Sequence, residues 1–62
     1  MRGWRVQWYA KDQYVPKGEK PYDKFIPALK FAVQVKHRTG IKSVKIFRIP
    51  DMTLYWRDGQ FL

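Results

Sequence analysis

Cysteine is absent from this 62-residue sequence, and histidine and serine each occur only once. Without cysteine, the chain forms neither disulfides nor metal sites with thiolate ligands. The five acidic residues fall mostly in expected turns, without the spacing of a metal cluster or of a general acid–base pair. His37 lies near the end of an expected helix, where a cation is favourable without any catalytic role. We therefore expect no catalytic residue, no metal, no cofactor and no enzymatic activity.

Long hydrophobic stretches are also lacking. No apolar run approaches the length of about 18 residues that spans a membrane. The first residues, Met-Arg-Gly-Trp-Arg, do not contain the apolar segment of a signal peptide. The sequence therefore predicts a cytoplasmic protein without a membrane partner.

Positive charge and aromatic rings are what the sequence has in excess. Thirteen lysines and arginines stand against five acids, which gives a formal net charge of +8, and aromatic residues make up 18% of the chain. Such a number of rings can supply the core of one small domain over residues 1–62. A domain this basic usually meets something anionic, so nucleic acid and an acidic protein surface are the partner classes that the charge favours.

Three segments have the pattern of β-strands. Residues 4–10 alternate strictly between two faces, and residues 42–49 and 54–57 are rich in the residue types that strands favour. Pro50 and Asp51 mark a turn between the last two segments. Asp58-Gly59 is a hairpin-type dipeptide with only three residues after it, so we expect a short fold-back there rather than a full strand.

One helix is expected between the first two strands. Residues 24–38 place apolar side chains on one broad arc, with Asp23 as the candidate N-cap and Gly40 as the C-terminal stop. Residues 12–23 contain Pro16, Gly18 and Pro21, and this composition predicts a long loop.

The predicted fold is α+β, a single β-α-β-β domain with one helix packed on a three-stranded, mainly antiparallel sheet. The favoured strand order places residues 54–57 in the centre, because Leu-Tyr-Trp is the most apolar strand segment and the other two strands carry the cations typical of edges. The alternative order places residues 42–49 in the centre, parallel to residues 4–10.

A single helix covers only one face of such a sheet, so the alternation assigns each strand residue to a side. The expected core consists of Trp4, Val6, Trp8, Phe25, Leu29, Ala32, Val33, Val44, Ile46, Leu54 and Trp56. The opposite face is expected to carry Arg5, Gln7, Tyr9, Lys45, Phe47, Ile49, Tyr55 and Arg57. Aromatic rings among cations on an open sheet face suit the binding of nucleic acid.

The leading hypothesis is a non-enzymatic nucleic-acid-binding module of low sequence specificity, with single strands favoured. The rings of Tyr9, Phe47 and Tyr55 would stack on bases. Six cations would bind phosphates, with the last three of them in the long loop or just before it: Arg5, Lys45, Arg57, Lys11, Lys17 and Lys20.

Other interpretations of this face stay open. The long loop or Phe61-Leu62 could cover it, a second copy could pack on it in a homodimer, or its rings could be ordinary cross-strand pairs on a monomer. The alternative function is a small interaction or inhibitor protein, of the kind that phages encode, which docks on an acidic surface of a larger complex through an exposed strand edge.

Overall fold

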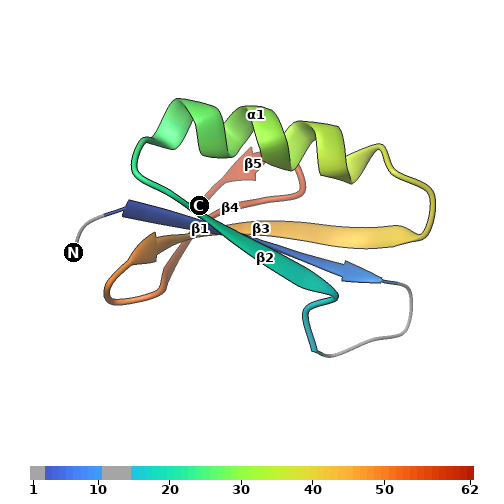
Figure 1. Cartoon of the computed structure of the whole chain (residues 1–62), viewed down its shortest axis with the longest axis horizontal. Helices are drawn as coiled ribbons and strands as arrows, with labels where there is room; N and C mark the ends of the chain where they lie inside the picture. The colour runs from blue at the N-terminus through green and yellow to red at the C-terminus, as the bar shows by residue number, and fades with distance from the viewer. Residues whose placement is uncertain (1–2, 11–14) are drawn as a thin grey trace.

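The computed structural model describes residues 3–10 and 15–62, and in these ranges it consists of a five-stranded antiparallel sheet with one helix on one face (Figure 1). The elements are β1 (Gly3–Ala10), β2 (Gly18–Tyr22), α1 (Phe25–Lys36), β3 (Ile41–Ile49), β4 (Thr53–Arg57) and β5 (Gln60–Phe61). The strand order is β2-β1-β3-β4-β5. The predicted α+β class with a single helix layer is confirmed, whereas the three-stranded sheet and its favoured order are wrong.

The expected loop over residues 12–23 contains a strand instead. β2 pairs antiparallel with β1, from Trp4 opposite Tyr22 to Trp8 opposite Gly18. Pro21 is compatible with this strand because β2 lies at the edge of the sheet, where one row of backbone groups needs no partner. A side chain at Gly18 would overlap the Trp8 indole, because its Cβ would fall against Cζ2 of that ring. Glycine therefore lets the strand approach the ring closely.

The presence of β2 also explains the strand order. Because β2 reverses the chain before the helix starts, β3 returns antiparallel to β1 and pairs along its whole length. β2 and β3 both run antiparallel to β1, so they are parallel to each other and α1 crosses over the strand between them. β3 is therefore the central strand, with β1 on one side and β4 on the other.

The core lies between α1 and the inner face of the sheet. Its fully or almost fully buried members come from three strands and the helix: Val6, Val44, Ile46, Trp56, Ala28, Ala32 and Val35. This confirms the predicted inward faces of β1 and β3. Val33 was expected in the core, but this prediction is wrong, because its side chain is 42% exposed. The buried side of the helix runs through Ala28, Ala32 and Val35 instead.

A β-bulge in the pairing of β3 with β4 changes the faces of two β4 residues. Ile46 pairs with Trp56, but Phe47 pairs with Leu54, so Tyr55 is an extra residue on β4. Leu54 therefore shares the outer face with Phe47, and the prediction that it belongs to the core is wrong. The Tyr55 ring lies on the helix side instead, with its centroid 4.9 Å from that of Trp4 and 5.4 Å from that of Phe25.

The turn between β4 and β5 confirms the expected fold-back. Asp58 and Gly59 have φ angles of 50° and 97°, the left-handed values that a tight hairpin of this type requires. The Asp58 carboxylate accepts hydrogen bonds from the Val44 backbone N–H at 2.8 Å and from the Ser43 hydroxyl at 3.0 Å. The Asp58 carbonyl oxygen accepts one from Lys36 Nζ at 3.0 Å. One turn residue thus ties β3 and the end of α1 to the β4–β5 hairpin.

The N-terminus of α1 differs from its prediction. The N-cap is Lys24 rather than Asp23, and it makes no side-chain capping hydrogen bond. Its backbone is extended, with φ −120° and ψ 149°, which is the geometry that a capping side chain needs. No acidic residue occupies the first turn either, so the free N–H groups and the positive end of the helix dipole have no side-chain partner there.

Replacing Lys24 with aspartate should therefore stabilise the protein. The new carboxylate can accept a hydrogen bond from a first-turn N–H and complements the helix dipole, so we expect a gain of about 1 kcal/mol in the free energy of unfolding. Thermal unfolding followed by circular dichroism should show a melting temperature raised by about 4–8 °C. Lys24→Ala, which removes the same positive charge without a capping oxygen, should give a smaller change, and an equal rise in both variants would contradict capping as the cause.

Candidate functional site

The candidate site is the face of the sheet that points away from α1, which we call the open face. The strand register places these residues on it: Arg5, Gln7, Tyr9, Glu19, Pro21, Ser43, Lys45, Phe47, Ile49, Leu54 and Arg57. In the part of the chain that the structure describes, no helix or strand crosses this face, since α1 lies entirely on the other side (Figure 1). Within the described residues, the open face is therefore not covered by another helix or strand.

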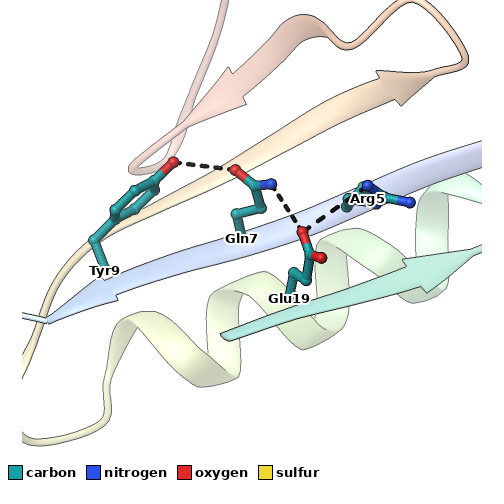
Figure 2. Close-up of polar contacts among 4 residues, drawn as sticks. All are labelled: Arg5, Gln7, Tyr9 and Glu19. Atoms are coloured by element: carbon teal, nitrogen blue, oxygen red, sulfur yellow. Dashed lines mark hydrogen bonds and ion pairs between the residues drawn. The ribbon is translucent and has the colours of Figure 1, made fainter. Parts of the chain in front are cut away.

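A chain of polar contacts runs across β1 and β2 on the open face (Figure 2). The Tyr9 hydroxyl donates a hydrogen bond to Gln7 Oε1 at 3.0 Å, and Gln7 Nε2 donates one to Glu19 Oε1 at 2.9 Å. A guanidinium nitrogen of Arg5 lies 3.9 Å from the same Glu19 oxygen. Both side chains of this ion pair are partly exposed, so the pair orients the groups more than it stabilises the fold.

Lys45 adds a cation to the same row. Its Nζ lies 4.8 Å from the centroid of the Tyr9 ring, a cation–π distance, so one side of that ring already faces a positive charge. Gln7 lies directly opposite Lys45 on β1, and Arg57 lies opposite it on β4. Positive charge therefore extends over the three middle strands of the sheet.

Phe47 lies at the centre of the open face. It is opposite Arg5 on β1 and opposite Leu54 on β4, and its side chain is half-buried by these neighbours. Ile49, two residues further along β3, is half-buried on the same face. The ring therefore sits in an apolar strip, with Arg5 opposite it on β1 and Lys45 two residues away on β3.

The structure brings together five of the predicted binding residues on the open face: Arg5, Tyr9, Lys45, Phe47 and Arg57. Two predicted members are on the other side of the sheet. The bulge turns Tyr55 toward the helix, and Lys20 pairs with Val6, which puts its ammonium 5.1 Å from the Phe31 ring on α1. Lys17 is exposed in the segment before β2, and Lys11 lies outside the described residues.

Four residues of the open face were missed by reasoning from the sequence: Glu19, Pro21, Ser43 and Leu54. Glu19 and Pro21 were assigned to a loop because Gly18 and Pro21 give this segment the composition of a turn, and Ser43 was not assigned to either face. Leu54 was assigned to the core because strict alternation from Trp56 leads there, and no signal in the sequence marks the bulge.

Three acidic side chains of the described residues, those of Glu19, Asp51 and Asp58, serve local structure. Asp58 holds the β4–β5 turn and Glu19 joins β1 to β2. In the β3–β4 turn, the hydrogen bond from the Thr53 hydroxyl, aided by nearby Arg48, lowers the pKa of the exposed Asp51. Within residues 3–10 and 15–62, no three histidine, aspartate or glutamate side chains come together as a metal site would require, and no helix has the length and apolarity needed to cross a membrane.

Comparison with known proteins adds no relationship: no protein-family model, no curated protein and no solved structure matches this chain. The function is therefore argued from the geometry of the open face and from its charge.

Proposed function

We propose that this protein is a small, non-enzymatic module that binds single-stranded nucleic acid through the open face. The observation that carries the proposal is the Phe47 ring at the centre of this face, with Arg5 beside it on β1 and Lys45 two residues away on β3. A base can stack on the exposed part of a ring whatever its identity, so binding of this kind has low sequence specificity.

Single strands suit this surface better than a duplex. Stacking needs a base whose flat side is free, and in a duplex both sides of each base are covered by neighbouring bases. The cations that surround Phe47 come from β1, β3 and β4, so a strand crossing the sheet can place a base on the ring while its phosphates meet Arg5 on one side and Arg57 on the other.

The charge balance of the open face supports an anionic ligand. Among the described residues it carries three cations, Arg5, Lys45 and Arg57, against the carboxylate of Glu19 and that of Asp58, which Ser43 holds at the end of the face. The side chain of Glu19 is 51% exposed, and one of its oxygens lies 3.9 Å from a single guanidinium nitrogen of Arg5. The other N–H groups of the guanidinium can therefore donate hydrogen bonds to a phosphate. An acidic protein surface is the alternative ligand for the same cations.

Neutralising the three cations of the open face tests the proposal. Arg5→Gln, Lys45→Gln and Arg57→Gln combined should weaken binding to labelled oligo-dT and oligo-U, measured by fluorescence anisotropy at several salt concentrations. The slope of log K against log salt is negative, and each lost phosphate contact makes it less steep by about 0.7 for single strands. The magnitude of the slope should therefore decrease by about 2.

The matched control neutralises three exposed cations that are not on the open face: Lys30, Lys42 and Arg48. Both triple variants have the same net charge, so a general effect of charge changes them equally. Equal weakening of the two variants, or absence of oligonucleotide binding by the unmodified protein, would remove the open face as a nucleic-acid site. A partner pulled down equally well before and after nuclease treatment would favour the acidic protein surface instead.

A further inference from the structure

The helix covers only part of its side of the sheet. α1 packs on β1, β3 and β2 and also covers Trp56 of β4, whereas Tyr55 and Phe61 at the rim of the sheet stay partly exposed. The rim of this side, at Tyr55 and β5, is therefore not fully covered by α1.

Apolar side chains line this place from two directions. From the sheet come Tyr55 and Phe61, and from α1 comes Phe25, whose ring centroid is 5.4 Å from that of Tyr55 and 5.9 Å from that of Phe61. Phe61 is 60% exposed and Tyr55 is 38% exposed. Rings that pack against one another yet stay this open form a surface with part of its apolar area uncovered.

The flank of α1 continues the apolar surface. Phe31 contacts Trp8 and Tyr22 and so marks the side of the helix toward β2, while Phe25 marks the side toward β5. At 100° per residue, Leu29, Val33 and Ile26 follow in turn beyond Phe25. Phe25 and Leu29 pack against the core, whereas Val33 and Ile26 are 42% and 57% exposed, so the outer part of this flank is not used by the core. We call the whole surface the shelf; its residues are Phe25, Ile26, Leu29, Val33, Tyr55 and Phe61.

Three lysines lie around the shelf, against Asp23 at one end and Asp58, whose carboxylate is bonded to β3, at the other. Lys36 lies at one end, where its Nζ reaches the Asp58 carbonyl oxygen, and exposed Lys24 precedes Phe25 at the other end. Lys30 lies beyond Ile26 on the helix, and α1 contains no acidic residue. A second copy of this protein, itself of net charge +8, would be repelled by these cations, whereas an acidic partner would be attracted.

We propose that the shelf binds an acidic, amphipathic helix of a partner protein, which lies alongside α1 over β4 and β5. Its apolar stripe would cover Phe61, Tyr55, Val33 and Ile26, and its carboxylates would face Lys24, Lys30 and Lys36. A helix fits better than a membrane surface because the shelf is an angle between a helix and a sheet, which a flat bilayer cannot enter.

The test uses a synthetic helical peptide of about 20 residues, with leucine at i, i+3, i+4 and i+7 spacing and glutamate on its other face. The full-length protein, labelled with ¹⁵N, is titrated with this peptide, with a scrambled peptide of equal composition, and with vesicles containing anionic phospholipid. We expect the amphipathic peptide to shift the amide resonances of α1 and of residues 54–62, and to bind at least tenfold more tightly than the scrambled one.

Two double variants locate the binding. Ile26→Gln with Phe61→Gln should weaken peptide binding at least tenfold, whereas Val15→Gln with Met52→Gln, which changes exposed apolar residues outside the shelf, should not. Both variants should bind oligonucleotides as the unmodified protein does, so this proposal can fail independently of the open face. Equal binding of the two peptides, binding to vesicles alone, or a homodimer that the shelf variant dissociates would each overturn it.

Discussion

Replacing Ile46 with alanine should cost about 2–5 kcal/mol of the free energy of unfolding, which is a large part of the total stability of the protein. Ile46 is fully buried on the central strand, between Val6 of β1 and Trp56 of β4, so truncation leaves a cavity that the sheet cannot easily close. A chain of this size has a total stability of only about 3–9 kcal/mol. Urea unfolding followed by circular dichroism measures the loss.

Phe47→Ala is the matched control, because it truncates the next residue of the same strand on the opposite face. The Phe47 side chain is only half-buried, so we expect this variant to remain folded and to lose less stability than Ile46→Ala. If Phe47 stacks on a base, its removal costs about 1–3 kcal/mol of binding, which weakens affinity for oligo-dT about 5- to 150-fold. A folded Phe47→Ala protein with unchanged affinity would remove Phe47 from the proposed site.

The second large effect is expected at Asp58. Asp58→Ala should destabilise the protein by about 2–4 kcal/mol, because it leaves the Val44 N–H without its acceptor and places alanine at a positive φ of 50°. The Ser43 hydroxyl loses its partner at the same time. The loss should appear as a lower urea midpoint and as faster amide hydrogen exchange at Val44.

Asp51→Ala serves as the control for this prediction. It removes the same charge from the other β-hairpin turn, where the carboxylate is exposed and accepts a hydrogen bond from the Thr53 hydroxyl. We expect a loss below about 1 kcal/mol for this variant. Similar losses for the two aspartates would mean that the Asp58 carboxylate does not hold β3 to the turn.

The faces of β1 and β3 could be predicted from the sequence because the alternation there is undisturbed. Trp4, Val6 and Trp8 on β1, like Val44 and Ile46 on β3, leave only one side of each strand that can be buried. Arg5, Lys45 and Phe47 were therefore placed correctly on the open face. The fold-back at Asp58-Gly59 was predictable for a similar local reason, since few dipeptides adopt two successive positive φ angles so readily.

What could not be predicted depends on contacts between distant segments. β2 has a turn-like composition, and it is a strand only because β1 offers an edge beside which Gly18 and Pro21 can lie. The bulge beside Phe47 is fixed by how β4 meets β3, and it exchanges the faces of Leu54 and Tyr55. Once β2 was missed, the direction of β3 relative to β1 was also wrong.

The position of β1 between β2 and β3 has a consequence for how the protein folds. Val6 pairs with Lys20 nearby in the sequence, but its other partner, Ile46, lies 40 positions further along the chain. The β1–β2 hairpin can form early, yet an isolated two-stranded hairpin is only marginally stable in water. The rate-limiting event is then the arrival of β3, which must close a large loop before it gains any contact, so folding should be slower than that of a helical protein of equal length.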